Sequence, residues 1–183
     1  MNPGLASIPS KFNGFRIGPL RLWALPQVRR LERTVFPEPL ALGQLWHKFW
    51  QPEVHYLVAW DGYRVAAYFG FEVQGAAAHV ISNATDPHYR RRGLGRFLLQ
   101  AAENWARVAG GRYFLGEVRR SNRAQQLLLA QIGWVTVAEV TRLFGNGEDG
   151  FVVWRGLTSA GPATAAETRI SPNLPRTGQN SPL

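Results

Sequence analysis

The residues best suited to chemistry fall within one short segment, positions 86–99, which reads DPHYRRRGLGRFLL. A predicted strand ends here, Pro87 interrupts it, and a predicted amphipathic helix begins a few residues later. Gly93 and Gly95 have no Cβ atom, so the backbone N–H groups of this turn can approach an anion closely. The first turn of a helix adds unpaired N–H donors and the positive end of the helix dipole. The segment therefore predicts a turn that binds pyrophosphate.

The spacing of the two glycines excludes two common nucleotide motifs. The turn lacks the Gly-Lys-Ser/Thr ending of a Walker loop, and no third glycine follows three residues after Gly95. A Gly-x-Gly pair alone is a weak signal, because a strand-to-helix turn with arginines can be purely structural. A sharper assignment needs a second element elsewhere in the chain.

The basic charge of the chain is concentrated around the same turn. The net charge is +9, and the stretch 86–123 contains nine arginines against three acidic residues. This concentration predicts a docking surface for phosphate groups. The alternative is a solvated basic face in an arginine-rich protein, since the chain has only two lysines, Lys11 and Lys48.

The periodicity of the apolar residues places this turn in an α/β (α+β) fold. Four helices are predicted from helical spacing, at 24–35, 40–49, 93–109 and 122–132. Six strands are predicted from aromatic and β-branched runs, at 56–60, 64–73, 79–85, 113–118, 135–144 and 151–155. In the third strand, Val80, Ser82 and Ala84 are expected to share one face. We predict a mixed, mostly antiparallel sheet of about six to seven strands, flanked by about four helices, in which the strand–helix–strand unit supplies a parallel pair.

The composition along the chain predicts one domain with two flanking segments. Residues 1–14 are expected to be a flexible leader, residues 15–157 the folded domain, and residues 158–183 a disordered tail, because large apolar residues become rare after Leu157. No apolar run approaches the roughly 20 residues of a membrane-spanning helix, and the N-terminus lacks a secretory signal. We therefore expect a cytoplasmic protein that does not enter a membrane.

Several types of site are excluded or disfavoured by composition. The chain has no cysteine, which rules out disulfides, thiolate–zinc sites and an acyl-cysteine intermediate. The four histidines lack metal-ligand spacing, so no metal is expected. Most of the tryptophans are expected in the core, although Trp46 and Trp50 lie one helical turn apart and could wall an acceptor pocket.

A second element agrees with the turn and makes a family resemblance specific. The pattern Arg90-x-x-Gly93-x-Gly95 resembles the acetyl-CoA-binding motif of the GNAT family of N-acetyltransferases. The run EVRRSN at 117–122, followed by Gly133-Trp134, resembles the branch that acetylates the N-terminal alanine of ribosomal proteins. Further matches lie at positions 25–26, 32, 36–37 and 148–149, so the resemblance spans about residues 20–157.

The resemblance implies a GNAT fold and acetyl-CoA as co-substrate. A splayed strand at 83–85 would hold the pantetheine arm through its backbone, and residues 91–96 would hold the diphosphate. The cofactor-binding residues implied are Asn83, Ala84, Thr85, Arg91, Arg92, Gly93, Leu94, Gly95, Arg96 and Asn122.

Helical spacing bears independently on Asn122. It places Asn122, Gln125, Gln126 and Leu129 on one face of their helix, and the opposite, apolar side is expected to consist of Ala124, Leu127, Leu128 and Ile132. Asn122 can equally be a plain N-cap.

The resemblance also implies direct attack by the acceptor amine in a ternary complex, with Glu117 as the general base. The absence of cysteine and of a Gly-x-Ser-x-Gly elbow agrees with this route. The alternative for Glu117 is a structural pairing with Arg119 or Arg120. Two departures concern the acceptor: Leu129 occupies the position of the branch's general-acid tyrosine, and the final hairpin is shorter and lacks its paired tyrosines. Tyr113 and Ser121 are the hydroxyls that could replace the acid.

The acceptor is predicted to be a protein or peptide N-terminal α-amine, for example that of a ribosomal protein. An α-amine, with a pKa of about 7.7–8.0, is roughly a tenth neutral at pH 7, whereas a lysine amine is almost fully charged. The alternatives are a small-molecule amine, a non-catalytic acyl-CoA-binding module, and a basic RNA-associated protein. Nucleic acid is the weakest of these, because no known RNA-binding motif occurs. The sequence makes no prediction of the oligomeric state.

Overall fold

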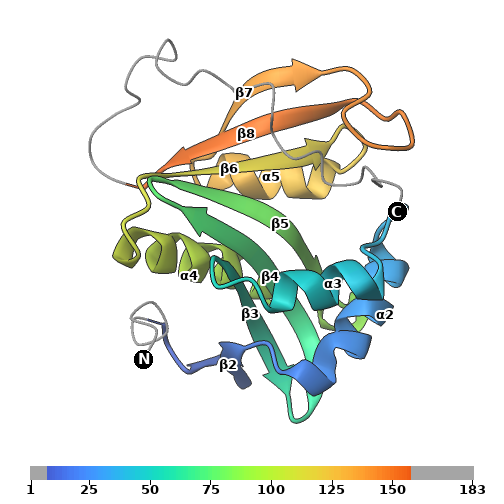
Figure 1. The fold of residues 1–183 in the computed structure, drawn as a ribbon, viewed down its shortest axis with the longest axis vertical. Coiled ribbons are helices and arrows are strands. Elements are labelled where there is room, and N and C mark those ends of the chain that lie inside the picture. The colour runs from blue at the N-terminus through green and yellow to red at the C-terminus, as the bar shows by residue number, and fades with distance from the viewer. Residues whose placement is uncertain (1–7, 158–183) are drawn as a thin grey trace.

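A single eight-stranded sheet organises the part of the chain that the structure, a computed structural model, describes, residues 8–157. The strand order is β1-β2-β3-β4-β5-β6-β8-β7 (Figure 1). Neighbouring strands are antiparallel except for β5 and β6, which are parallel and are joined through a helix. The strands are β1 Lys11–Phe12, β2 Phe15–Pro19, β3 Val54–Asp61, β4 Arg64–Gln74, β5 Ala77–Thr85, β6 Tyr113–Arg119, β7 Val135–Val140 and β8 Gly150–Gly156.

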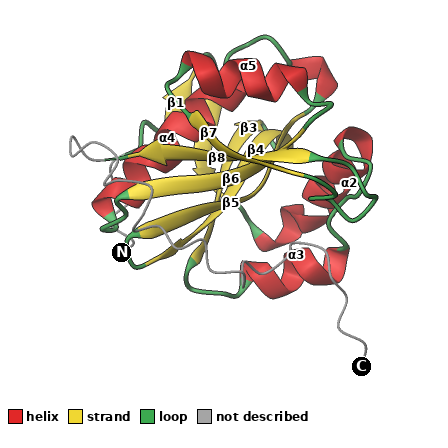
Figure 2. Cartoon of the chain, turned by 90° about the horizontal axis from the view of Figure 1, so that it is seen from above, coloured by secondary structure: helices red, strands yellow, loops and turns green. Residues whose placement is uncertain are grey.

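Helices cover both faces of this sheet (Figure 2). The α-helices are α2 Leu25–Val35, α3 Leu42–Phe49, α4 Leu94–Val108 and α5 Arg123–Gln131, and the 3₁₀ turns are η1 Leu22–Ala24 and η2 Pro87–Tyr89. Helices α2 and α3 pack on one face, and α4 and α5 pack on the other. The predicted α/β fold with four helices and one parallel strand pair is confirmed.

The central strands are apolar on both sides because each side faces a helical layer. In β3, Leu57 and Ala59 belong to the core under α4, whereas Val58 and Trp60 belong to the core under α2. A strand that is buried on both faces reads as a continuous apolar run rather than an alternating one. Strands β3 and β4 form a hairpin, and Gly62 takes the positive φ of +58° that its tight turn requires.

The sheet is larger at its N-terminal edge than predicted. Strands β1 and β2 pair with each other, and β2 then pairs with β3. Strand β1 lies within residues 1–14, which were expected to be a flexible leader, so sheet structure begins at Lys11. A strand of two residues has no periodicity to detect, which is why the sequence analysis missed it. Residues 1–7 and the predicted tail 158–183 lie outside the described residues.

A β-bulge in β5 changes which side chains share a face. Gly70 of β4 pairs with Ser82 while the next residue, Phe71, pairs with Val80, so Ile81 is an extra residue. Consequently Val80 packs against the core under α4, whereas Ser82 contacts Tyr68 on the α2 side. The expectation that Val80, Ser82 and Ala84 share one face is therefore wrong for Val80.

Six of the seven tryptophans divide into two groups, and the seventh, Trp154, is half-buried. Trp60, Trp105 and Trp134 are buried, as expected, but Trp23, Trp46 and Trp50 are about half exposed. The last predicted hairpin also differs, because β7 ends at Val140 rather than at residue 144.

Candidate active site

The turn before α4 has the backbone geometry of an anion-binding loop. The side chain of Asp86 accepts a hydrogen bond from the N–H of His88 at 2.9 Å, which fixes η2. Arg91 and Gly93 then adopt positive φ values of +63° and +77°. Helix α4 begins at Leu94, and no side chain caps it. Its first N–H groups are therefore directed out of the helix without a side-chain acceptor.

Gly95 has no packing reason to be a glycine. A Cβ added there would meet only the hydroxyl of Thr85, at 3.7 Å, which is an ordinary contact. Its φ is not positive, in contrast to that of Gly93. The missing side chain leaves the space above the first turn of α4 open, which is what a closely approaching ligand requires.

Arginines surround this helix start. Arg90, Arg91, Arg92 and Arg96 are all exposed, and none forms an ion pair with another described residue. The Arg92 guanidinium lies 5.5 Å from the centre of the Tyr89 ring, and the backbone carbonyl of Arg92 accepts a hydrogen bond from Asn13. Positive charge here is therefore uncompensated within residues 8–157.

Strand β5 loses its neighbour beside this turn. It pairs with β6 only from Ala77 to His79, and the two strands then move apart (Figure 1). Asn83, Ala84 and Thr85 still pair with β4 on their other side. Their backbone groups on the β6 side have no strand partner, which matches the splayed strand that the resemblance implied.

Glu117 lies on β6, on the sheet face that carries α2 and α3. Burial alternates along this strand, so Glu117 shares a face with Tyr113, Leu115 and Arg119, and it is half-buried. Its partner on β8 is Val152.

Asn122 acts as the N-cap of α5. Its side-chain oxygen accepts a hydrogen bond from the N–H of Gln125 at 3.1 Å, so the capping alternative is realised. That bond uses the amide oxygen and leaves the Nδ2 donor out of the cap. The two roles considered for Asn122 are therefore compatible.

The two faces of α5 differ from the sequence expectation. Leu129 is only 4% exposed and packs in the core with Ile132, whereas Leu127, expected on the buried side, is 65% exposed. Of the four residues predicted to share one face of α5, Leu129 is therefore the one that is buried in the core. Leu129 replaces the tyrosine of the related branch with a packed aliphatic side chain.

Two hydroxyls were considered as substitute acids, and neither is well placed. Ser121 donates its hydroxyl to Glu148 Oε1 at 2.6 Å. Tyr113 lies four residues from Glu117 along the same strand, a separation of about 13 Å. The hydroxyl of Ser121 is already bound to Glu148, and Tyr113 is the first residue of β6, at the far end of the strand from Glu117.

A buried carboxylate network, which the sequence analysis missed, supports the bulge of β5. Glu32 of α2 is 1% exposed and accepts hydrogen bonds from Tyr68, from Ser82 (2.5 Å) and from the N–H of Leu40 (2.8 Å). Burial and the nearby Glu32 carboxylate raise the pKa of Tyr68 well above its ordinary value. The signals in the sequence were the match at position 32 to the related family branch and one acidic residue at an apolar position of a helix.

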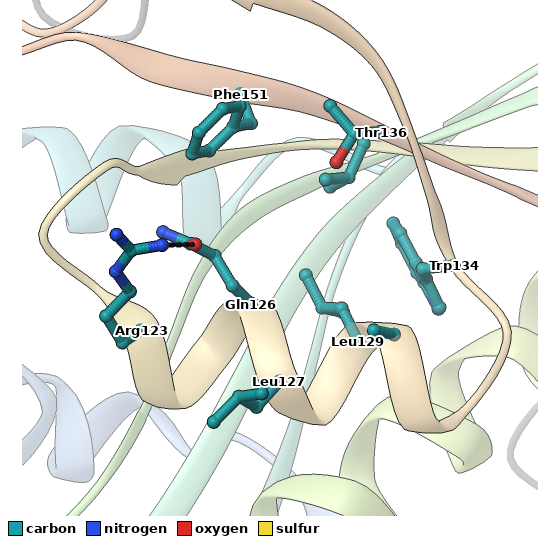
Figure 3. Close-up of a pocket in the computed structure, with 9 residues that line it drawn as sticks. Arg123, Gln126, Leu127, Leu129, Trp134, Thr136 and Phe151 are labelled. Carbon is teal, nitrogen blue, oxygen red and sulfur yellow. Dashed lines mark hydrogen bonds between the residues drawn. The ribbon is translucent and has the colours of Figure 1, made fainter.

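One cavity in the described part of the chain lies away from the predicted site. It has a volume of about 530 Å³ and lies between α5 and strands β7 and β8 (Figure 3). Its lining consists of Arg123, Gln126, Leu127, Leu129, Ala130, Trp134, Thr136, Phe151 and Val153. Phe151 and Val153 pack on the α4–α5 side of the sheet, opposite to Glu117. None of the predicted site residues lines this cavity.

Other site types receive no support from the described residues. Between residues 8 and 157, no group of three histidine, aspartate or glutamate side chains is arranged to hold a metal ion. No helix in this part of the chain is long and apolar enough to cross a membrane. The absence of a metal and the intracellular location remain predictions.

The described residues thus combine an open-edged mixed sheet, one parallel strand pair that splays, and an uncapped helix start flanked by arginines. The family model of the acetyltransferase (GNAT) family matches residues 25–134. The chain therefore belongs to the GNAT acetyltransferase family.

Individual relatives agree with this assignment. A proposed ribosomal protein bS18-alanine N-acetyltransferase of Bacillus subtilis (strain 168) is 28% identical over 137 residues, covering 74% of this chain and 91% of that protein. The ribosomal-protein-S18-alanine N-acetyltransferase from Escherichia coli has a similar fold, with a TM-score of 0.73, 23% identity, and coverage of 81% of this chain and 97% of that one. Arabidopsis thaliana NAA60 in complex with acetyl-CoA gives a TM-score of 0.71 at 13% identity, covering 78% and 98%.

Proposed function

We propose that this acetyltransferase moves the acetyl group of acetyl-CoA to the N-terminal α-amine of a protein or peptide. The observation that carries the proposal is the uncapped start of α4, flanked by arginines without ion pairs. It lies beside the stretch of β5 that no longer pairs with β6. A diphosphate and an extended amide-bearing arm are the chemical groups that these two features would bind together. Acetyl-CoA contains both.

The residues present fit such a co-substrate. The N–H groups of residues 91–96 would hold the diphosphate, and Arg91, Arg92 and Arg96 would add charge-assisted contacts. Backbone groups of Asn83, Ala84 and Thr85 would pair with the pantetheine arm as an added strand does. The Nδ2 donor of Asn122, which its cap leaves out, would contact the same arm.

Glu117 would accept the proton that the acceptor amine loses. Acetyl-CoA supplies a thioester carbonyl, and the amine must be neutral to attack it. An α-amine with a pKa of about 7.7–8.0 needs little help to reach that form, whereas a lysine amine near 10.4 needs much more. A half-buried carboxylate on β6 therefore suits an α-amine better than a lysine.

Leu129 bears on the departure of the leaving group. A thiol with a pKa of about 8.5 can leave as the thiolate near neutral pH, so a dedicated acid is not essential. A missing acid would still slow the reaction, by up to about 10²–10⁴-fold. We infer direct attack in a ternary complex, without a proton donor from α5.

A ribosomal protein N-terminus in the cytoplasm is the acceptor favoured by the B. subtilis relative. A small-molecule amine is the second candidate, and the packed Leu129 together with the early end of β7 favours it. A non-catalytic module would bind acetyl-CoA without turnover.

Two measurements test the proposal. Calorimetry with acetyl-CoA at two salt concentrations should give saturable binding that weakens moderately with salt. A CoA-release assay should show faster turnover of a peptide with N-terminal alanine than of a panel of small amines. Absence of heat and of a thermal shift with acetyl-CoA would refute the proposal. Preferential turnover of a small amine would show that the acceptor is a small molecule and not a peptide N-terminus.

A further inference from the structure

Arg119 is the most highly connected cation in the described chain. Its guanidinium donates to Glu38 Oε2 at 2.5 Å, to Glu148 Oε2 at 2.9 Å and to Asn146 Oδ1 at 3.1 Å. It also lies 4.0 Å from the centre of the Phe144 ring. The side chain is only 12% exposed, although all four of its partners come from loops.

These contacts join three segments that are distant in the sequence. Glu38 belongs to the α2–α3 connection, residues 36–41, and Asn146 and Glu148 belong to the β7–β8 connection, residues 141–149. Arg119 lies on β6, on the same face as Glu117 and two residues from it. Arg119 therefore links both connections to β6, two residues from Glu117.

Glu148 is fixed at its second oxygen as well. Its Oε1 accepts hydrogen bonds from the hydroxyl of Ser121 at 2.6 Å and from the N–H of Ser121 at 3.0 Å. These bonds, followed by the Arg119 guanidinium, lower the pKa of Glu148 to about 2. The carboxylate thus stays charged and paired at every pH at which the protein would be assayed.

The charge of the cluster depends on Arg119. One guanidinium shared by two carboxylates leaves one net negative charge, and removal of the guanidinium would leave two. Unpaired carboxylates at the mouth of a site attract substrates that carry more than one positive charge.

We propose that Arg119 is a positioning residue that sets acceptor specificity, because it holds the two connections at a fixed distance from Glu117 and occupies both carboxylates. The inference rests on the proposed function, in which Glu117 faces the acceptor. With Arg119 in place, the site accepts a peptide N-terminus. Glu38 and Glu148 are then paired with Arg119 and do not bind the second charge of a diamine.

The test compares Arg119→Gln with Arg119→Lys, using the alanine peptide and 1,4-diaminobutane as acceptors. Arg119→Gln should raise the KM for the peptide about ten-fold while the KM for acetyl-CoA changes less than about two-fold. It should also raise the diamine-to-peptide ratio of kcat/KM at least about three-fold. Arg119→Lys keeps the charge and should restore the ratio but only part of the peptide KM, since lysine cannot form the forked contact.

Arg120→Gln is the matched control. Arg120 is next in sequence and pairs with Glu139 and Asp149 of the same hairpin, but makes no contact with the α2–α3 connection. It should leave both KM values and the acceptor ratio unchanged. Equal effects of Arg119→Gln and Arg120→Gln would overturn the proposal, as would a peptide KM that does not respond to Arg119→Gln.

Hydrogen exchange provides a readout that does not require turnover. In Arg119→Gln, the amides of residues 36–41 and 141–149 should exchange faster than in the wild type, with α4 unaffected. If Arg119→Gln does not fold, Glu38→Gln releases the α2–α3 connection alone and should produce the change only at 36–41. Unchanged exchange would overturn the positioning role, whereas lack of turnover with altered exchange would overturn only the proposed function.

Discussion

The two helices that follow β5 and β6 start in opposite ways. Helix α4 begins after Gly93 with no side-chain cap and with exposed arginines around it. Helix α5 begins after Asn122, which caps it, and Gln126 turns back to donate to the carbonyls of Arg119 (3.0 Å) and Arg120 (2.9 Å). Both follow strands of the same parallel pair, so their position in the fold does not explain the difference.

The difference shows what an available helix terminus requires. Capping and side-chain bonds satisfy the start of α5 internally, which makes that turn rigid and leaves little for a ligand. The start of α4 keeps its donors and its dipole for an external anion. We therefore expect binding energy for acetyl-CoA to come mainly from α4, and chemistry to come from β6, the strand that leads into α5.

The largest effect should come from separating chemistry from binding. Glu117→Gln should lower kcat by about 10²–10⁴-fold, because the general base is lost, while the affinity for acetyl-CoA stays the same. A CoA-release assay measures kcat, and calorimetry measures the affinity for acetyl-CoA. Turnover that survives the substitution would show that β6 does not supply the base.

Blocking the space above α4 should come next. Gly95→Val should weaken acetyl-CoA binding by about 100-fold with little change in Tm, because a Cβ atom at this position meets only the Thr85 hydroxyl among the described residues. The matched control is Ala124→Val, at the second residue of α5, which is exposed and should leave binding unchanged. Equal losses of acetyl-CoA affinity in both variants would show that the start of α4 is not a more important binding element than the start of α5.

Removing charge at α4 should have an intermediate effect. The double variant Arg91→Gln/Arg92→Gln should lower acetyl-CoA affinity about ten-fold at low salt, and by less at high salt, because exposed charges are screened. Arg123→Gln, at the first residue of α5, serves as the control and should change affinity little. A loss that is independent of salt would indicate a packing effect instead.

The smallest effect should come from the cap of α5. Asn122→Ala should lower the free energy of unfolding by about 1 kcal/mol and Tm by about 2–4 °C. Asn122→Asp keeps an oxygen to cap the helix but loses the Nδ2 donor, so stability should hold while acetyl-CoA affinity falls several-fold. Thermal unfolding and calorimetry distinguish these outcomes, and a purely structural Asn122 would show no affinity change in the aspartate variant.

Several structural features around the candidate site could be predicted because their signals are local. Gly93 lies in a turn that needs positive φ, and Asp61-Gly62 forms the expected hairpin. The face of Glu117 followed from the two-residue period of a strand. Each of these features depends on neighbours within a few positions.

The errors arose where distant segments decide the outcome. A bulge at Ile81 moved Val80 to the other face, because the pairing of β4 with β5 shifts by one residue at that point. Leu129 packs into the core formed by residues of β3, β4, α4 and β6, which lie far from it in the sequence. The partners of Arg119 lie 81 and 29 positions away, so no local pattern could identify them.

By itself the sequence determined the order of the elements, the glycine-rich turn and the excess of arginines around it. These follow from backbone sterics, hydrophobic periodicity and charge, which act over a few residues. Only the tertiary structure decided where β5 and β6 diverge beside the start of α4, and that Glu38 and Glu148 converge on Arg119. Those outcomes depend on how the sheet and its helices pack together, and long-range packing leaves no periodic trace in the chain.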